Sequence, residues 1–220
     1  NRPLVQGRLK PQQATIFALV TGIFGKAFLL IFTNVLTAWL TLAALVGYAF
    51  VYTMFLKRAT PQNIVIGGLA GAAPPLLGWT AVTGEVHYNA LLLVLVIFAW
   101  TPPHFWALAV HRKDEYANAE IPMLPVTHGE HYTKIHILLY TFILLAVTAL
   151  PYATGMLNWL YLLGAMVLNV GFIYWALVML LTDRKSAGMD TFRYSIVYLM
   201  ALFVIMLLDH YLLPITQPFI

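Results

Sequence analysis

The 220-residue chain is strongly apolar, with 61% hydrophobic residues, 9% charged residues and a mean hydropathy of +0.82. A water-soluble domain needs far more surface charge than this, so the composition indicates a protein whose solvent is lipid. The formal net charge of +4 is small, and the sequence gives no reason to expect a nucleic-acid partner. The absence of cysteine excludes disulfide frameworks, zinc–thiolate and iron–sulfur sites, and cysteine nucleophiles.

Seven stretches are apolar over a length that crosses a membrane, which takes roughly 20 helical residues for about 30 Å of hydrocarbon. In chain order they are residues 12–32, 36–56, 62–82, 90–110, 134–152, 159–181 and 194–213. We therefore expect an all-α fold, a polytopic bundle of transmembrane helices in which residues 1–220 form one domain.

The basic residues are distributed very unevenly over the connections between these spans. All Lys and Arg residues except Lys26, which lies inside the first span, fall in connections on one side, within residues 2–10, 57–58, 112–134 and 184–193. The opposite loops, near 33–35, 83–89, 153–158 and 214–220, contain none. The positive-inside rule places the basic side in the cytoplasm of a bacterial inner membrane.

Two polar segments on the basic side are candidates for chemistry, because charge near lipid is costly and is often retained for function. The first runs from Tyr52 to the basic pair Lys57 and Arg58 at the end of the second span. The second covers residues 104–125 and reads HFWALAVHRKDEYANAEIPMLP.

The second segment carries several oxygen ligands. Asp114 and Asn118 are four residues apart, so they share a helical face if the helix continues past Arg112. Glu115 and Glu120 add two carboxylates nearby. Such ligands suit Mg²⁺, which typically binds one or two carboxylates together with phosphate oxygens.

Basic side chains accompany these carboxylates, namely Arg112, Lys113, Lys57 and Arg58. They supply the positive charge that a diphosphate requires. We interpret the two segments as a site for an amphiphile whose diphosphate head lies at the interface and whose tail lies in the bilayer. The alternative is structural: Lys57-Arg58 is then ordinary flanking charge, and RKDEYANAE is a solvated loop.

His104 follows Pro102 and Pro103 inside the fourth span. One interpretation is that it pairs with a backbone carbonyl that proline leaves free. The other is a contact to substrate, as an axial ligand of a porphyrin or a partner of its propionates. At the outer end of the last span, Asp209 and His210 are expected to be exposed at the interface.

A different pattern marks the third span. Gly67 and Gly71 form a GxxxG pair, and Pro74-Pro75 follows in the same span. We interpret the pair as close helix packing and the prolines as a kink.

Four runs together resemble one known family. They are Tyr52 to Arg58, GGLAGAAPPLLGW at 67–79, WTPPHF at 100–105 and DEYANAEIPMLPVTHG at 114–129. In this order they closely resemble the protohaem IX farnesyltransferases (haem O synthases), a branch of the UbiA-type intramembrane prenyltransferase superfamily. The opening residues 1–9 look like the segment that follows the first aspartate-rich motif of that family.

The resemblance implies a nine-helix fold around a central cavity. It also implies that farnesyl diphosphate ionises there with Mg²⁺, and that the farnesyl group adds to a vinyl group of haem b, the second substrate. By position, Asp114 and Glu115 become the metal and diphosphate ligands, with Asn118 as a third candidate. The basic pair at 57–58 matches diphosphate contacts, and His104 matches the proline–histidine pair of the family and is a candidate haem contact.

The chain departs from the family at its beginning. The first motif, of NxxxDxxxD type, has no counterpart, and the chain starts with Asn rather than Met. We expect a truncated sequence that lacks the N-terminal helices, has seven spans of an expected nine, and is inactive alone. The resemblance further implies partners in the supply of haem to haem–copper oxidases, including a haem A synthase.

Three alternatives remain at this point. Another UbiA-type prenyltransferase, acting on a quinone or chlorophyll precursor, would share most of these motifs. A non-enzymatic haem b anchor subunit needs paired axial histidines, and only His104 lies well inside a span. A transporter would show inverted repeats, which are absent, although Pro74-Pro75 and Pro102-Pro103 break two spans.

Overall fold

The computed structural model describes residues 6–213, apart from the side chain of Arg58, and this range contains helices and no strand. The helices are α1 (Pro11–Phe32), α2 (Val35–Val46), η1 (Gly47–Leu56), α3 (Lys57–Ala59), α4 (Asn63–Gly71), α5 (Pro74–Thr83), α6 (Tyr88–His111), α7 (Lys113–Asn118), α8 (Leu124–Thr127), α9 (Glu130–Ala153), α10 (Trp159–Leu181) and α11 (Ala187–Leu212).

The expected all-α bundle with seven spans is confirmed. Seven helical stretches of the described chain are long and apolar enough to cross a membrane. The span predicted at 194–213 begins earlier, at Ala187, because its first turns contain Asp190 and Arg193, which a hydropathy window excludes but a helix tolerates. The predicted kink at Pro74 is a full break, since α4 ends at Gly71 and α5 starts at Pro74.

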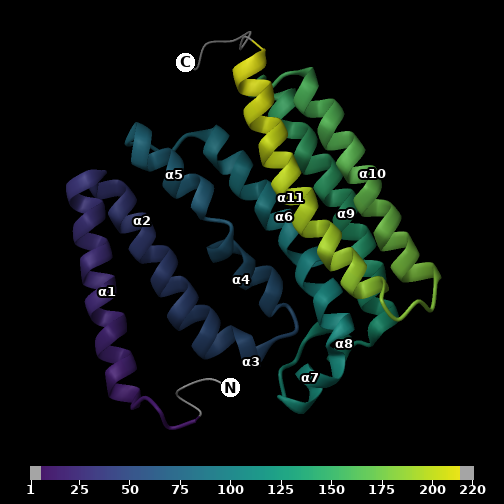
Figure 1. The fold of residues 1–220 in the computed structure, drawn as a ribbon, viewed down its shortest axis with the longest axis horizontal. Coiled ribbons are helices and arrows are strands. Elements are labelled where there is room, and N and C mark those ends of the chain that lie inside the picture. Colours follow the sequence, from purple (N-terminus) through teal and green to yellow (C-terminus); the bar gives the residue numbers. More distant parts are fainter. Residues whose placement is uncertain (1–5, 214–220) are drawn as a thin grey trace.

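The spans form two unequal groups. Helices α6, α9, α10 and α11 pack closely together, whereas α1 and α2 stand on the other side of the molecule, with α4 and α5 between the two groups (Figure 1). No residue of α1 is buried, although its sequence is almost wholly apolar. The tight group is therefore the packed core, and the α1–α2 hairpin is attached to it through η1, α4 and α5.

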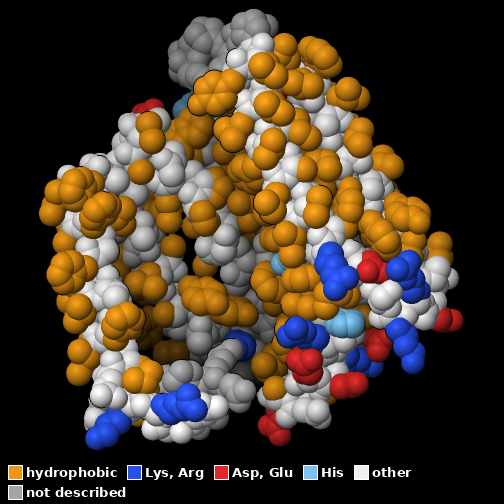
Figure 2. Space-filling view, in the orientation of Figure 1, with side chains coloured by type: hydrophobic (Ala, Val, Ile, Leu, Met, Phe, Trp, Pro, Cys, Tyr) orange, Lys and Arg blue, Asp and Glu red, His pale blue; other side chains and the backbone are white. Residues whose placement is uncertain are grey.

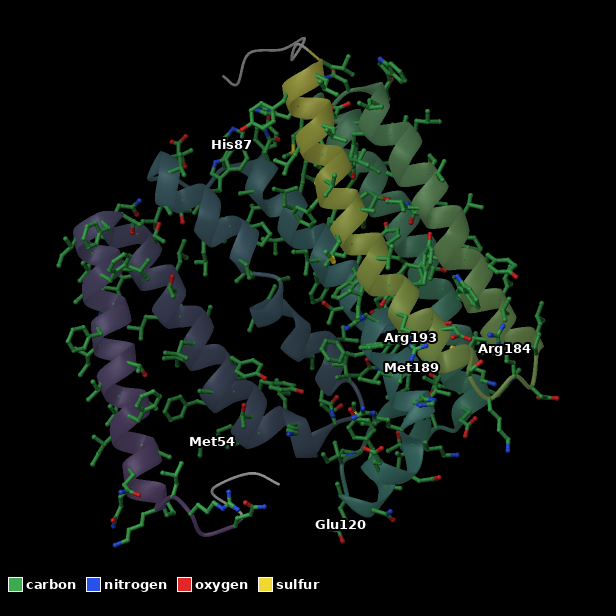
Figure 3. All side chains as sticks on the ribbon, in the orientation of Figure 1. Met54, His87, Glu120, Arg184, Met189 and Arg193 are labelled. Atoms are coloured by element: carbon green, nitrogen blue, oxygen red, sulfur yellow. The ribbon has the colours of Figure 1, made fainter. Side chains whose placement is uncertain are left out.

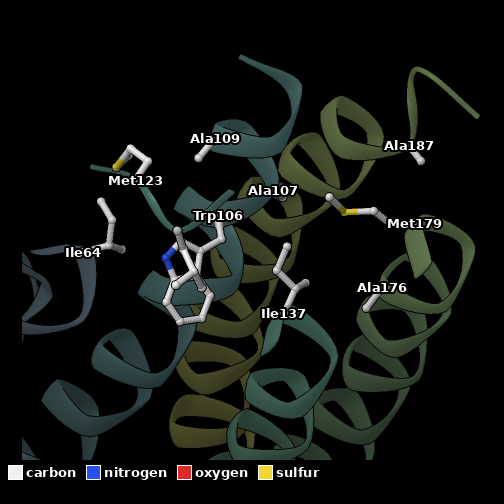
Figure 4. Close-up of a cluster of buried hydrophobic side chains, with 10 residues drawn as sticks. Ile64, Trp106, Ala107, Ala109, Met123, Ile137, Ala176, Met179 and Ala187 are labelled. Atoms are coloured by element: carbon white, nitrogen blue, oxygen red, sulfur yellow. The ribbon is translucent and has the colours of Figure 1, made fainter. Parts of the chain in front are cut away.

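Small residues allow the core helices to approach closely. A Cβ atom at Gly188 of α11 would lie 2.9 Å from the backbone oxygen of Ala107 in α6, so that crossing requires glycine. One buried cluster joins α6, α9 and α10 through Trp106, Ile137 and Met179 (Figure 4). It lies at the end of the bundle that the charge distribution predicts to face the cytoplasm. Glycine contacts and close side-chain packing are the usual means by which helices associate in lipid.

Charged side chains gather at one end of the bundle. They lie where α6 ends, α9 begins and α10 connects to α11, while the sides of the helices are hydrophobic (Figure 2). Figure 3 places Glu120 and Arg184 at this end and His87 at the opposite end. The sequence-based division of the connections into a basic side and a side without Lys or Arg is therefore present in the fold.

The expectation that Asp209 is exposed at the interface is wrong. Asp209 is fully buried, with 0% of its surface exposed. Its carboxylate accepts hydrogen bonds from the backbone N–H groups of Asn158 (2.7 Å) and Tyr161 (2.9 Å) at the start of α10. These N–H groups have no partner inside the helix, and the positive end of the helix dipole favours a carboxylate there. Asp209 thus ties the end of α11 to the beginning of α10.

Replacing this carboxylate should destabilise the bundle. Asp209→Ala leaves two buried N–H donors unpaired, so we expect a loss of about 3 kcal/mol in the free energy of unfolding. Thermal unfolding of the purified protein in detergent measures the change. His210→Ala is the matched control, because His210 is exposed next to Asp209. Equal stability of both variants would contradict the capping role.

Candidate functional site

The first candidate segment lies on a π-helix. Residues Gly47–Leu56 form η1, in which the hydroxyl of Thr53 donates to the backbone oxygen of Tyr48, five residues earlier, at 2.9 Å. Wide helical turns of this kind are uncommon and often occur at functional sites. The basic pair follows directly, with Lys57 and Arg58 in the short helix α3.

Tyr52 of η1 packs directly on the backbone of α4. A Cβ atom at Gly67 would overlap the Tyr52 ring, so this contact requires glycine. The ring also stacks on Tyr48, with centroids 5.2 Å apart. The predicted close packing of the GxxxG pair is confirmed at Gly67, whereas a Cβ at Gly71 would meet open space.

Two apolar hollows meet at Tyr52 and Gly67. One, of about 340 Å³, lies between α2–η1 and α4–α5 and is lined mainly by aliphatic residues, among them Ala43, Val51, Ile66, Leu69 and Ala70. We call it the aliphatic hollow. The other, of about 330 Å³, lies between η1, α4 and α6 and includes Tyr48, Ile97, Trp100, Thr101 and Phe105. We call it the aromatic hollow.

Lys57 lies next to the aliphatic hollow. Its preceding residue, Leu56, lines that hollow, and the Lys57 side chain is half-buried. Its backbone oxygen accepts a hydrogen bond from the side-chain amide of Asn63 at 3.2 Å, and Asn63 is only 1% exposed. Asn63 therefore fixes the turn that positions the basic pair. The side chain of Arg58 lies outside the described part of the structure.

We expected Asp114 and Asn118 to share a helical face if the helix continued past Arg112. Helix α6 does not continue past this residue. Helix α6 ends at His111, the chain bends at Arg112, and α7 starts at Lys113, so Asp114 and Asn118 still lie on one short helix. The predicted side chains of this segment are mostly exposed: Arg112 lies 3.8 Å from Glu115, and Lys113 pairs with Glu130 at 3.2 Å.

Asp114 does not line either apolar hollow. It faces a separate polar hollow of about 440 Å³, with Glu130, Lys134, Asp183, Arg184 and Lys185 among its other lining residues. The structure thus places Tyr52 in the wall of both apolar hollows, and it places Lys57, whose backbone N–H donates to the Tyr52 oxygen, one residue beyond Leu56 of the aliphatic hollow. It places Asp114, Glu115, Asn118, Arg112 and Lys113 on or beside α7, at the same end of the bundle (Figure 1).

The carboxylates of α7 do not form a complete metal site by themselves. Among residues 6–213, no group of three or more His, Cys, Asp or Glu side chains is arranged to hold a metal ion. Asp114 and Glu115 are adjacent, exposed, hard oxygen donors. Mg²⁺ commonly uses one or two carboxylates and completes its shell with water and phosphate oxygens, so these residues fit a metal that a diphosphate helps to hold.

His104 is buried between α6 and α11. Its Nδ1 lies 2.6 Å from the hydroxyl of Ser195, which in turn donates to the backbone oxygen of Phe192 at 2.6 Å. The imidazole stacks on Trp100 and Phe192, with centroids 4.1 and 4.6 Å away. The expectation of a freed backbone carbonyl as its partner is wrong; the partner is a hydroxyl on α11.

Comparison with known proteins identifies the family. Residues 1–208 match the UbiA prenyltransferase family. The chain belongs to the UbiA prenyltransferase family. This UbiA chain is 75% identical to a protoheme IX farnesyltransferase of Saccharophagus degradans, over 97% of its own length and 71% of the relative's. It is 65% identical to the one of Teredinibacter turnerae, with coverages of 98% and 69%.

A further relative and a solved structure agree with this. Protoheme IX farnesyltransferase 1 of Pseudomonas putida strain GB-1 is 68% identical over 97% of the chain and 72% of the relative. A solved digeranylgeranylglyceryl phosphate synthase has the same fold, with a TM-score of 0.78, 17% identity, and coverage of 95% of this chain and 73% of that one. The multi-pass membrane architecture is thus that of the UbiA family.

Sequence reasoning missed two contributors to this UbiA site. Asn63 gave no signal beyond its position five residues after the basic pair, in a segment that was interpreted as the start of a span. Ser195 lies 91 residues from its partner His104, so no local pattern connects them. Gly67 was noticed for packing, but its contact with Tyr52 needs the wide turns of η1.

The contact between Tyr52 and Gly67 predicts an energetic coupling between the two residues. Gly67→Ala places a methyl group into the ring, and such overpacking costs about 1–3 kcal/mol. The same substitution made in a Tyr52→Ala background should cost much less, because the ring is gone. Thermal unfolding of the four proteins of this double-mutant cycle measures the coupling. Gly78→Ala is the control, since a Cβ there meets nothing within 4 Å. Additive effects would contradict the contact.

Proposed function

We propose that the protein to which this chain belongs carries out the reaction of a protohaem IX farnesyltransferase, the transfer of a farnesyl group from farnesyl diphosphate to haem b, giving haem O. The observation that carries this proposal is its 65–75% identity, over nearly its whole length, to relatives of that name. The four motif runs that carry the family resemblance, between Tyr52 and Gly129, lie within this aligned region. A quinone-directed or chlorophyll-directed UbiA enzyme has no comparable observation in its favour.

In the proposed reaction the bond between the farnesyl carbon and the diphosphate oxygen breaks, and the diphosphate leaves with the electron pair. The terminal carbon of a haem b vinyl group bonds to the farnesyl carbon. Water adds to the cationic carbon that results and loses a proton, which leaves a hydroxyl group. Farnesyl diphosphate, haem b and water thus give haem O, diphosphate and a proton.

The basic side chains have the first role in this proposal. Lys57 and Arg58 bind the diphosphate at the end of η1, and Arg112 and Lys113 add positive charge at the same end of the bundle. Preorganised cations stabilise the negative charge that develops on the leaving group. Asp114 and Glu115, with Asn118 as a third candidate, would hold Mg²⁺ for the diphosphate at the same end of the bundle, although Asp114 lines the polar hollow and not the hollows beside Lys57. When bound, the ion supplies further charge neutralisation.

The apolar surroundings have the second role. Allylic cations react with water, so the transfer requires a compartment from which bulk water is excluded. The hollows on both sides of Tyr52 are lined almost entirely by apolar side chains. We also propose His104 as a haem contact, held in place by Ser195 and by the rings of Trp100 and Phe192. His104 lines neither hollow itself, but Trp100, on which it stacks, lines the hollow next to Tyr48.

The location completes the proposal. The protein resides in the bacterial inner membrane with its basic loops in the cytoplasm. Its product passes to a haem A synthase or to haem–copper oxidase assembly. The N-terminal helices and the first aspartate-rich motif expected from the family stay predictions, to be checked in the gene sequence upstream of Asn1.

The activity is tested in membranes that contain the intact gene product, supplied with haem b and farnesyl diphosphate. Chromatography with mass detection should show haem O, and chelation of Mg²⁺ should abolish it. Lys57→Ala should lower kcat/KM at least about 100-fold, because a charged contact to a diphosphate is worth roughly 3 kcal/mol. The control is Lys185→Ala, in the exposed loop before α11. Haem bound without prenyl transfer would instead support an anchor subunit and contradict the proposal.

Two variants test the assignment of the metal ligands. The double variant Asp114→Ala and Glu115→Ala should lower the rate of conversion strongly and raise the Mg²⁺ concentration required for the half-maximal residual rate. Glu120→Ala is the matched control, since Glu120 is an exposed carboxylate just beyond α7. Unchanged conversion in the double variant would show that these two carboxylates do not bind the metal.

The orientation is tested with single cysteines, because the chain has none of its own. Glu85→Cys and Lys185→Cys place exposed thiols at opposite ends of the bundle. In spheroplasts, a membrane-impermeant maleimide should label the first and should label the second only after permeabilisation. The reverse pattern would overturn the cytoplasmic assignment of the basic loops.

A further inference from the structure

The two hollows at Tyr52 differ in the chemistry of their walls. Apart from Tyr52 itself, the aliphatic hollow is lined by alanine, glycine, valine, leucine and isoleucine. The aromatic hollow adds Tyr48, Trp100 and Phe105 and has three glycines, Gly67, Gly68 and Gly71, along α4. Walls of branched and small aliphatic groups suit a flexible hydrocarbon chain, whereas flat rings favour stacking on another flat ring system.

Tyr52 separates these two spaces. Its ring lines both hollows, and it cannot move toward α4 because it already lies against Gly67. It is supported from the other side by the stacked ring of Tyr48. Each hollow alone, at about 340 and 330 Å³, is at the lower limit of the range of about 300–1,000 Å³ that ligand pockets occupy. Each space therefore suits one ligand group, and together they suit two.

This inference rests on the proposed function: we propose that the two substrates occupy the two hollows separately. The isoprenoid chain lies in the aliphatic hollow and the face of the porphyrin lies in the aromatic hollow. The Tyr52 ring separates the two along most of their length, and the farnesyl carbon that carries the diphosphate meets the vinyl carbon beyond the ring, at the Lys57 end of η1.

The position of Lys57 favours the aliphatic hollow for the isoprenoid. Leu56 lines the aliphatic hollow, and the next residue in the chain is Lys57, so the basic pair begins at its rim. A diphosphate bound there has its hydrocarbon tail directed along η1 between α2 and α4. Neither lining contains a charged side chain, so the difference between the hollows lies in the adjacent Lys57 and in the rings of the aromatic hollow, which come from η1 and α6. The only side-chain hydroxyl of the aromatic hollow besides those of Tyr48 and Tyr52 belongs to Thr101, which donates to the backbone oxygen of Ile97 at 2.7 Å.

Two glycines allow each hollow to be filled without disturbing the other. Gly47 lines only the aliphatic hollow and Gly71 only the aromatic hollow, and a Cβ at either one meets nothing within 4 Å. Leucine at these positions extends into free space, and replacing a helical glycine usually stabilises the helix. Gly78→Leu is the matched control, because Gly78 is an exposed helical glycine with equally open space that lies outside both linings.

The experiment measures both KM values of the intact enzyme in membranes for each variant. Gly47→Leu should raise KM for farnesyl diphosphate about tenfold, and Gly71→Leu should raise KM for haem b by a similar factor, which corresponds to about 1.4 kcal/mol of binding free energy. Each variant should leave the other KM within about twofold, and Gly78→Leu should change neither. Absorbance titration of the purified protein with haem b gives the haem affinity without turnover and should show the loss in Gly71→Leu alone.

The outcomes separate this assignment from the proposed function. If the wild-type protein makes no haem O, the proposed function itself fails. If it makes haem O but the two effects are exchanged, or both variants raise both KM values equally, or neither changes either value, the assignment of the hollows is overturned. Thermal unfolding identifies a variant that fails to fold, and Gly47→Ala or Gly71→Ala then replaces it, with a smaller shift of the same KM expected.

Discussion

The contact between the Tyr52 ring and the backbone of Gly67 is the interaction on which the site depends. It joins η1 to α4 at the point where both apolar hollows meet, and it exists only because position 67 carries no side chain. The same contact fixes the direction of η1, whose last residue precedes Lys57. The proposed diphosphate-binding end and the proposed hydrocarbon-binding space thereby lie on one helix, which is the arrangement that an amphiphilic substrate requires.

Lipid imposes the second constraint, since every polar group within the bundle needs a partner inside the protein. Asp209 meets the unpaired N–H groups of α10, and Ser195 meets His104, so that α11 is connected to α10 at one end and to α6 further along. These polar contacts, together with the crossing at Gly188, hold α6, α10 and α11 as a firm core. The α1–α2 hairpin is tied to α5 instead: the Asn34 amide donates to the backbone oxygen of Thr80 (2.7 Å), and the Thr37 hydroxyl donates to the Thr80 hydroxyl (2.9 Å).

Hydropathy was sufficient to predict the seven spans, because lipid selects for length and apolarity along the chain and for little else. It was not sufficient for the segment from Gly47 to Leu56, since a π-helix has no distinctive composition, and a normal helix would direct Tyr52 differently. The burial of Asp209 was missed because its partners lie about 50 residues away and are backbone groups. A sequence shows which charges lie on one side of a membrane but not which hollow each one faces. Asp114 and Lys57 therefore looked like members of one cluster, yet the break at Arg112 directs Asp114 toward the polar hollow beside α11.

The central claim is that an isoprenoid diphosphate binds with its head at Lys57 and its chain along η1. It is tested most directly by the structure of the intact protein bound to a non-hydrolysable farnesyl diphosphate analogue. The account predicts density for the chain between η1 and α4, against Tyr52, with the diphosphate within ion-pair distance of the Lys57 amine. A diphosphate in the polar hollow beside Arg184 and Lys185, or a chain lying away from Tyr52, would contradict it.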